Sequence, residues 1–311
     1  MLAAAVLGTA CGGATDKVSS STEAREGWPD KLSFAAAPAE QSSSLQESYG
    51  PVVEMLEKEL GVEVELTQVV DYAGVIEGMI SGKVQIAQFG PFSYVIARTN
   101  GAKIEPVGAL IDEKGGTAGY QSYGITRAGS PISSLKDYAG KKVCFVDPGS
   151  TSGFLYPSAG LIEAGVIASG TEADLGKGLT AVFAGGHDSS TLSVKNGDCD
   201  AGFAFDSMVD TELIEDGALK KGEVEVIWKS EVIPGSPIAI SQELPEDLQD
   251  ELASLITEKA NSDYLAANGF CEGECKLTDE GSWGWTPVDD SLYDGVRAVC
   301  ESTKSEKCNK A

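Results

Sequence analysis

Apolar residues recur with helical spacing between Leu45 and Leu60, and short β-prone runs flank this segment on both sides. The apolar face of the expected helix consists of Tyr49, Val52, Val53, Leu56 and Leu60, and Gly61 ends the helix. Two shorter helices are expected within residues 71–83 and at Ser93–Arg98. The predicted strands are Lys31–Ala37, Val62–Val70 and Val84–Phe89. Such alternation is typical of a mostly parallel sheet with helices on its faces.

The same alternation starts again near residue 120. The predicted strands are Tyr120–Thr126, Val143–Val146, Leu179–Phe183, Ala201–Phe205 and Val224–Trp228, with helices over 152–164 and Ser189–Asn196 between them. A Pro-Gly turn at 234–235 then leads into a β-prone run, as a strand returning to the first unit would. The chain from Pro245 onward is mainly helical. Two successive α/β units of similar layout predict two lobes.

Composition narrows the class of protein. The chain has 311 residues, of which 42% are hydrophobic, and it has no apolar run long enough to span a bilayer. Its 48 Asp and Glu residues outnumber 23 Lys and Arg residues, for a net charge of −25, which excludes a nucleic-acid partner. An anionic ligand remains compatible with this charge, because surface charges are screened over about 8 Å at physiological salt.

The N-terminus predicts an exported lipoprotein. An apolar run ends in Leu7-Gly-Thr-Ala-Cys11, which resembles a lipoprotein processing box with Cys11 as the lipidated residue. Gly8 departs from the commonest form of this box, and no Lys or Arg precedes the run. The alternative is a stray cysteine in a frayed terminus. We expect residues 1–29 to be the end of a signal and a flexible tether, and the protein to be extracytoplasmic and anchored to the cell membrane by lipid.

Six cysteines remain after Cys11, and an even number in an exported protein favours disulfides. The expected pairing joins Cys144 to Cys199 across neighbouring strands and pairs Cys271, Cys275, Cys300 and Cys308 among themselves. Cys271 and Cys275 also have the spacing of half a zinc site. The chain has only one histidine, however, and it lies far away in sequence, so no metal and no cofactor are expected.

Three consecutive hydroxyl residues, Ser150, Thr151 and Ser152, lie where a predicted strand gives way to a predicted helix. One hydroxyl suffices to cap a helix N-terminus, so three of them indicate an additional role. Hydroxyls and backbone N–H groups at the start of a helix can together bind an anion. The sequence therefore predicts an anion-binding site at this turn.

Other polar residues follow the ends of neighbouring predicted strands. His187 and Asp206 come after strands of the second unit, Tyr72 after a strand of the first, and Tyr120 lies between the units. Ligands of such sheets bind beyond the carboxyl ends of the strands, and in two-lobed proteins they bind between the lobes. These residues are therefore candidates for one interlobe cleft, with Gln88 and Phe89 as further lining.

Several segments together resemble the substrate-binding proteins of phosphonate, phosphite and phosphate ABC importers. The matching segments are DYAGVIEGM at 71–79, GYQSYGI at 119–125, DPGSTSGFLYP at 147–157, AGGHDSST at 184–191 and VIWKSEVIPGSPI at 226–238. The resemblance implies the two-lobed α/β fold of type II periplasmic-binding proteins, with two hinge-crossing strands. In that fold, residues 30–121 plus 236–311 form lobe I and residues 122–235 form lobe II.

The resemblance also assigns roles at the cleft. Ser150, Thr151 and Ser152 are expected to bind the phosphonyl oxygens, His187 to lie opposite them, and Tyr72 and Tyr120 to donate to the same oxygens. The implied partners are an ABC permease with its ATPase, reached after the lobes close on the ligand, and the protein is expected to be a monomer.

Two positions depart from family members that bind aminoalkylphosphonates. Those members hold the ammonium with carboxylates where this chain has Ser207 and Ser236. A buried ammonium would then lack its partners, at a cost of several kcal/mol. A small ligand is therefore expected, namely phosphite, methylphosphonate or phosphate. In one alternative, Asp206 replaces the missing acids and an aminoalkylphosphonate binds. In another, Asp206 accepts the hydrogen of a protonated phosphonyl oxygen and so distinguishes a monoanion from a dianion.

Two further classes of function are weighed against a transport protein. Ser150 or Ser152 with His187 and Asp206 has the residue types of a hydrolytic triad, but the pentapeptide Gly149–Gly153 has Thr151, not serine, at its centre. We therefore expect no enzyme. A sensor lipoprotein with the same fold and no role in transport is the other alternative.

Overall fold

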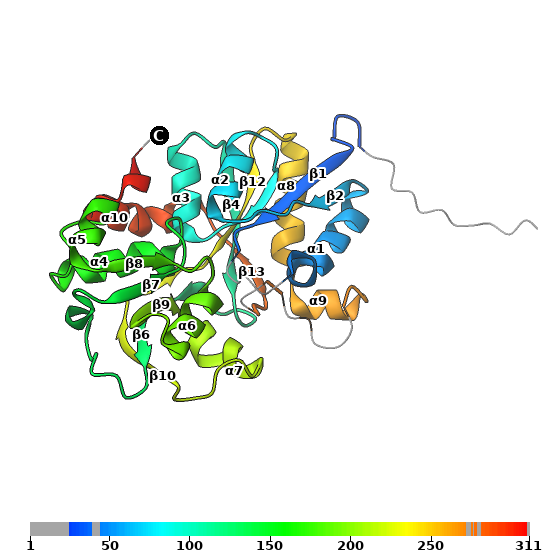
Figure 1. The fold of residues 1–311 in the computed structure, drawn as a ribbon. Coiled ribbons are helices and arrows are strands. Elements are labelled where there is room, and N and C mark those ends of the chain that lie inside the picture. The colour runs from blue at the N-terminus through cyan, green and yellow to red at the C-terminus, as the bar shows by residue number, and fades with distance from the viewer. Residues whose placement is uncertain (1–24, 39–43, 272–274, 276, 279–280, 310–311) are drawn as a thin grey trace, which may run out of the picture.

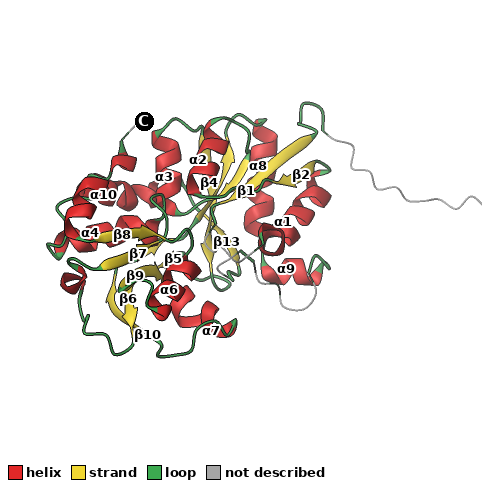
Figure 2. Ribbon diagram, viewed as in Figure 1, coloured by secondary structure: helices red, strands yellow, loops and turns green. Residues whose placement is uncertain are grey.

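Two open sheets and a short two-stranded ribbon between them organise the chain (Figure 1). The structure is a computed structural model and describes residues 25–38, 44–271, 275, 277–278 and 281–309. Helices pack around both sheets, as the colouring by secondary structure shows (Figure 2). None of the helices in the described residues is long and apolar enough to cross a bilayer.

The first sheet has the strand order β13-β4-β12-β3-β1-β2. Its strands are β1 (Lys31–Ala36), β2 (Glu63–Leu66), β3 (Ile86–Gln88), β4 (Ile104–Ile111), β12 (Pro237–Ser241) and β13 (Gly284–Pro287). The helices of this part are α1 (Leu45–Leu60), α2 (Tyr72–Ile80), α3 (Pro91–Thr99), α8 (Glu246–Glu258) and α9 (Ser262–Ala267).

The second sheet has the strand order β10-β6-β9-β7-β8. Its strands are β6 (Ser122–Arg127), β7 (Lys142–Phe145), β8 (Thr180–Phe183), β9 (Ala201–Phe205) and β10 (Val224–Lys229). Its helices are α4 (Tyr156–Glu163), α5 (Glu172–Gly178), α6 (His187–Asn196) and α7 (Leu213–Glu215), with π-helical turns at Thr151–Leu155 and Met208–Glu212. Short 3-10 turns lie at Leu135–Tyr138, Asp290–Tyr293 and Glu306–Cys308, and α10 (Asp294–Thr303) ends the helical part.

The chain passes between the two sheets at β5 (Gly119–Tyr120) and β11 (Ile233–Pro234), which pair with each other antiparallel. This ribbon is the pair of crossing strands that the sequence predicts, and the prediction of a two-lobed α/β fold is confirmed. The two units of alternating strands and helices seen in the sequence correspond to the two sheets.

The prediction of mostly parallel sheets is wrong, because each sheet is mixed. In the first sheet β1 is parallel to β2 and β3, whereas β12 is antiparallel to β3 and β4, and β13 is antiparallel to β4. In the second, β7 is parallel to β8 and β9, whereas β6 is antiparallel to β9 and β10. The physical reason is connectivity. Parallel neighbours need a crossover connection such as α1 or α2, whereas β6 and β12 enter their sheets directly from the ribbon.

The predicted element boundaries differ from the structure in particular places. The helix Leu45–Leu60 forms as predicted, and Gly61 adopts the left-handed conformation that ends it (φ 68°). The strand predicted at Val62–Val70 ends at Leu66, and Val70 is 84% exposed. Strand β4 is not anticipated, because Pro106 lies inside it. A register shift against β12 accommodates this proline.

One apolar cluster is continuous from the first lobe to the second. It includes Val75 and Phe92 near the first sheet, Phe145 and Leu161 near the second, and Val296 on α10. Helix α10 lies beside both α3 and α4 (Figure 1). The C-terminal helix therefore contacts both lobes, and the assignment of all of 236–311 to lobe I stays a prediction.

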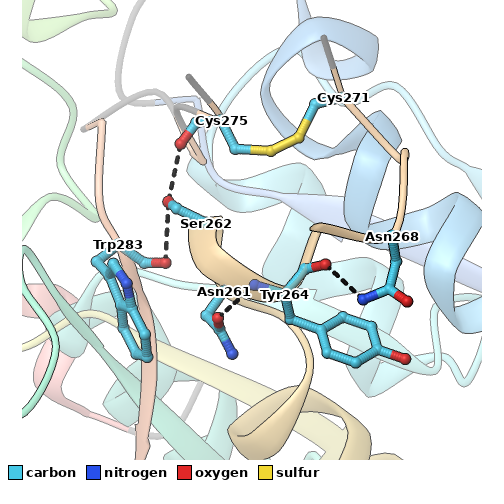
Figure 3. Close-up of a disulfide and its surroundings, with 7 residues drawn as sticks. All are labelled: Asn261, Ser262, Tyr264, Asn268, Cys271, Cys275 and Trp283. Atoms are coloured by element: carbon cyan, nitrogen blue, oxygen red, sulfur yellow. Dashed lines mark hydrogen bonds between the residues drawn. A yellow bond between two sulfur atoms is a disulfide. The ribbon is translucent and has the colours of Figure 1, made fainter. Parts of the chain in front are cut away.

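Three disulfides join the six cysteines that follow Cys11: Cys144–Cys199, Cys271–Cys275 and Cys300–Cys308. The predicted Cys144–Cys199 pair is confirmed, and the last four cysteines pair among themselves as expected. Cys271 and Cys275 join each other next to the start of α9, where the Ser262 hydroxyl donates to the Cys275 carbonyl at 2.8 Å (Figure 3). Cys11 lies outside the described residues.

Candidate ligand-binding site

A small cavity of about 20 Å³ lies between the two lobes. Its walls come from the first sheet and its helices on one side and from the second sheet and its helices on the other. The lining residues are Ala37, Tyr49, Tyr72, Gln88, Phe89, Gly90, Tyr120, Ser150, Thr151, Ser152, His187, Phe205 and Ser236. Most of the residues predicted for the cleft thus meet at one place.

The turn formed by Ser150, Thr151 and Ser152, here called the hydroxyl turn, follows β7. It begins a helix that continues into α4. Ser150 caps this helix, and its Oγ accepts the Gly153 N–H at 3.0 Å. The side chains of Ser150, Thr151 and Ser152 are almost fully buried, with 1%, 2% and 2% of their surface exposed. Since the first N–H groups of a helix have no partner inside it, backbone and side-chain donors are concentrated here. The helix begins one residue earlier than predicted.

Thr151 joins the two lobes. Its Oγ1 accepts the backbone N–H of Phe92 at 2.8 Å. Phe92 lies in the first turn of α3, directly after Pro91, so a side chain of the second lobe satisfies a helix N-terminus of the first. The Thr151 hydroxyl keeps its own hydrogen for donation to another acceptor.

His187 is the first residue of α6 and is 2% exposed. Its Nδ1 accepts the Phe205 backbone N–H at 3.1 Å, and its Nε2 lies 3.5 Å from Ser150 Oγ. Burial lowers the pKa of His187 to about 3, so the ring is neutral at physiological pH. A neutral ring whose Nδ1 accepts carries its hydrogen on Nε2, so His187 presents a donor toward Ser150.

The two tyrosines predicted for the site also line the cavity. Tyr72 is the first residue of α2, behind the capping Asp71, and it is 5% exposed. Tyr120 lies on β5, in the ribbon that links the lobes. The ribbon that links the lobes therefore contributes Tyr120 to the lining of the cavity.

Gln88 and Ser236 line the cavity, and Gln88 also forms hydrogen bonds with the surrounding structure. Gln88 Nε2 donates to the Ser236 carbonyl at 3.2 Å, and Gln88 Oε1 accepts the indole N–H of Trp285 at 2.9 Å. Both ends of the Gln88 amide are thereby engaged with the scaffold. Trp285 is 1% exposed, as expected for a packing residue.

Asp206 and Ser207 do not line this cavity. They line a neighbouring cavity of about 190 Å³ that shares Tyr120, Phe205 and Ser236 with the first. Phe205 lines both cavities, whereas Asp206, the first residue after β9, lines only the larger of the two. The Asp206 carboxylate accepts the N–H groups of Gln121 at 3.1 Å and Ser207 at 3.2 Å, and burial raises its pKa.

Four lining residues were not anticipated as site residues: Ala37, Tyr49, Gly90 and Phe205. Tyr49 was assigned to the apolar face of α1, where it also packs against Phe34. Gly90 precedes Pro91 at the start of α3, and a glycine before a helix start was the signal available in the sequence.

The geometry does not form a hydrolytic triad. In a triad the Nδ1–H of the histidine donates to a carboxylate, whereas Nδ1 of His187 accepts from the Phe205 backbone. Asp206 holds backbone N–H groups and lies in the other cavity. Within the described residues, no group of three or more His, Cys, Asp or Glu side chains is placed to hold a metal ion.

Comparisons with known proteins are consistent across sequence and fold. Residues 34–293 match the model of a family described as the periplasmic substrate-binding protein of phosphonate ABC transporters. The chain is 55% identical to the phosphate-import protein PhnD of Mycolicibacterium smegmatis over 306 residues, covering 98% of this chain and 94% of that protein. It is 33% identical to the phosphonates-binding periplasmic protein of Escherichia coli over 228 residues, covering 71% and 64% of the two chains.

A solved structure has the same fold. It is the binding protein component of an ABC phosphonate transporter from Pseudomonas aeruginosa, and it superposes with a TM-score of 0.73 at 24% identity, covering 89% of this chain and 87% of that one. The likeness identifies the fold as the two-lobed type II periplasmic-binding architecture.

Proposed function

Because the chain belongs to the family of periplasmic phosphonate-binding proteins of ABC transporters, we propose that it captures a small phosphorus oxyanion between its lobes. The candidate ligands are phosphite, methylphosphonate and phosphate. Members of this family are extracytoplasmic binding proteins rather than enzymes. The closed protein would deliver its ligand to a membrane permease driven by an ATPase.

The observation that carries this proposal is the gathering of neutral donors around a cavity of about 20 Å³. Ser150, Thr151, Ser152 and His187 are each at most 2% exposed there. Hydrogen bonds to a charged group contribute about 1.5–3 kcal/mol each, so several of them can hold a tetrahedral oxyanion without Lys or Arg. A cavity needs roughly 10–15 Å³ to hold one water molecule, so this space suits a compact ion rather than an extended one.

The relatives support phosphorus as the central atom. The 55% identical relative is named for phosphate import and the 33% identical one for phosphonates, so inorganic phosphate is the first ligand to test. An aminoalkylphosphonate remains the second candidate, because the neighbouring cavity is lined by Asp112, Asp206 and Asp210. An ammonium tail would have to reach past Tyr120, Phe205 or Ser236 to meet these acids.

Ligand capture would proceed by closure about the β5–β11 ribbon. The hydrogen bond from Phe92 N–H to Thr151 Oγ1 links the two walls of the cavity, and in this proposal it would break when the lobes open. One wall would bind the anion first, and closure would then complete the shell of donors.

Lipid attachment at Cys11 is the remaining part of the proposal. We expect the full-length protein to fractionate with membranes and a Cys11→Ala variant to be released into the soluble fraction. Equal membrane retention of both forms would contradict lipidation at this residue. The protein is further proposed to act as a monomer.

Isothermal titration calorimetry tests the choice of ligand. The full chain is titrated with phosphate, phosphite, methylphosphonate and 2-aminoethylphosphonate under identical conditions. Tight binding confined to the first three ligands supports the small-anion proposal, and preferential binding of 2-aminoethylphosphonate supports the second candidate. Failure of all four to bind would contradict the proposed function.

A further inference from the structure

Three side chains of the cavity each accept a hydrogen bond from a backbone N–H group. Ser150 Oγ accepts from Gly153 at 3.0 Å, Thr151 Oγ1 from Phe92 at 2.8 Å, and His187 Nδ1 from Phe205 at 3.1 Å. Neutral imidazole has one acceptor nitrogen, and Phe205 occupies it. Each of the two hydroxyls has one of its two lone pairs engaged by a backbone N–H and has one hydrogen to donate. The scaffold therefore orients all three groups as donors toward a ligand.

The distance between Ser150 Oγ and His187 Nε2, 3.5 Å, is at the upper limit of a hydrogen bond. Such a long contact satisfies neither group well. An oxygen atom that accepts from both would form shorter and stronger bonds than they form with each other. A charged oxygen would gain most, because bonds to ionised acceptors are roughly twice as strong as neutral ones.

The cavity offers a protonated oxygen no carboxylate acceptor. None of the described residues that line it is Asp or Glu. The carbonyl oxygen of the Gln88 amide already accepts from Trp285 at 2.9 Å. The Asp206 carboxylate lies in the neighbouring cavity, where it accepts from Gln121 and Ser207. A P–OH group placed against these donors would therefore leave a buried donor unpaired, which should weaken binding about 5- to 150-fold.

The three candidate ligands share one feature of their ionisation. Phosphite, methylphosphonate and phosphate each present three unprotonated oxygens only as the dianion, whereas their monoanions carry a hydrogen on one of those three. The fourth substituent on phosphorus, whether hydrogen, methyl or hydroxyl, is the same in both forms. The monoanion and the dianion therefore differ at one oxygen, which only accepts hydrogen bonds in the dianion and carries a hydrogen in the monoanion.

We infer that the cavity binds its phosphorus ligand as the dianion and rejects the monoanion. This inference rests on the proposed function and specifies which form of the ligand the site takes. The selection arises from the fixed direction of the hydrogen bonds at Ser150, Thr151 and His187, without a charged side chain in the cavity wall.

The titratable groups on elements around the cavity could also make binding depend on pH. They are Tyr49, Asp71, Tyr72, Tyr120, Asp147, His187, Asp188 and Asp206, with Lys307 near Asp147, and Asp112 and Lys229 near Asp206. His187 stays neutral in the working range because its pKa is about 3. Burial raises the pKa of both Asp147 and Asp206, so these two carboxyls are the protein groups to control for.

The test compares methylphosphonate with difluoromethylphosphonate, two ligands of nearly the same shape. The fluorines lower the pKa of the second ionisation, so the second ligand stays dianionic to a lower pH. Calorimetry measures the association constant of each with the full chain at several values of pH across the two ionisations. We expect the affinity to fall about tenfold for each pH unit below the second pKa of the ligand, until it levels off at the about 5- to 150-fold weaker affinity of the monoanion. The break, which is the pH at which the affinity begins to fall, should be lower for the fluorinated ligand. Asp147→Asn and Asp206→Asn should leave both breaks in place.

Each other outcome is informative. Undiminished affinity at a pH where the ligand is monoanionic would overturn the inference and leave the proposed function standing. If instead the affinity begins to fall at the same pH for both ligands, and Asp147→Asn or Asp206→Asn moves that pH, then a protein group titrates. This result would also overturn the inference. Failure of both ligands, and of phosphate, to bind at any pH would instead contradict the proposed function.

A His187→Gln variant adds a check that does not depend on the ligand series. The glutamine Oε1 can accept from Phe205 and its Nε2 can donate toward Ser150, so the direction of both bonds is preserved. We expect it to retain the pH break of the parent, whereas His187→Leu should lose affinity at every pH. A break that shifts in His187→Gln would show that the histidine itself titrates.

Discussion

Two neighbouring cavities share a wall and differ in chemistry. The small one is surrounded by the neutral donors Ser150, Thr151 and His187, whereas the larger one is lined by Asp112, Asp206 and Asp210. Tyr120, Phe205 and Ser236 belong to both. The proposed anion site and an acidic cavity thus share lining residues in a protein with a net charge of −25. Local donor direction, and not net charge, determines what each cavity can hold.

The comparison predicts that substitution of Thr151 causes the largest loss of ligand affinity. In Thr151→Val the ligand loses one donor and the Phe92 N–H loses its acceptor across the lobes. Since hydrogen bonds to charged groups contribute about 1.5–3 kcal/mol and 1.4 kcal/mol is tenfold in affinity, we expect phosphate or phosphite to bind about 100-fold more weakly. Thr151→Ser keeps the hydroxyl and should stay within about fivefold of the parent in the same titration. Equal loss in both variants would contradict this account, because Thr151→Ser keeps the hydroxyl.

We expect a second loss, of both ligand affinity and stability, when a substitution distorts the hydroxyl turn but removes none of its donors. A Cβ at Gly153 would lie 2.3 Å from Val146 Cβ and 2.7 Å from Ser150 Oγ. Gly153→Ala should therefore lower the free energy of unfolding by about 1–3 kcal/mol and displace Ser150 from the cavity. Gly176→Ala on α5 is the matched control, because a Cβ there meets nothing within 4 Å. Denaturant unfolding and calorimetry on both variants measure the two effects, and unchanged stability and affinity in Gly153→Ala would contradict this description of the turn.

A much smaller effect is expected in the acidic cavity. Because Asp206 does not line the small cavity and its carboxylate accepts from Gln121 and Ser207, Asp206→Asn should change the affinity for phosphite by less than about threefold. Asp210→Asn, in the same cavity, provides a comparison. A loss of more than about tenfold in Asp206→Asn alone would place this side chain on the ligand and remove the distinction between the cavities.

The same carboxyl gives a pH dependence of stability with a definite sign. Burial raises the pKa of Asp206, so the folded state binds its proton more tightly than the unfolded state does. Its contribution to stability is then greatest below the unfolded value of about 3.9 and declines as the pH rises through the raised folded value. The slope of unfolding free energy against pH over this window should flatten in Asp206→Asn, and an unchanged slope would contradict the assignment.

The sequence predicted the parts of the site that are local in the chain. The turn Ser150–Ser152 follows a strand and opens a helix, and His187 follows a glycine pair, so their positions at strand ends could be recognised from short segments. The two-lobed fold followed from the repeated alternation of strands and helices. Tyr72 and Tyr120 were candidates from their positions after a strand and between the units, and the cavity includes both. Resemblance to the family added only the expectation that their hydroxyls donate to the ligand.

The parts that could not be predicted depend on contacts between distant segments. Nothing near Thr151 in sequence indicates that its hydroxyl accepts from Phe92, 59 positions away. Residue types alone do not indicate that Asp206, directly after β9, lines the larger cavity and not the small one. The directions of β6 and β12 depend on the ribbon between the lobes, so the mixed sheets were missed as well.

The dianion claim is tested most directly by the ³¹P NMR spectrum of the bound ligand. Methylphosphonate is mixed with an excess of the protein, and the pH is lowered through the second pKa of the free ligand. We predict a bound resonance that stays at the position of the dianion while the free ligand titrates, and that loses intensity, rather than moving, as the pH falls. A bound resonance that shifts with pH in parallel with the free ligand would show that the cavity accepts the monoanion and would contradict the fixed donor arrangement.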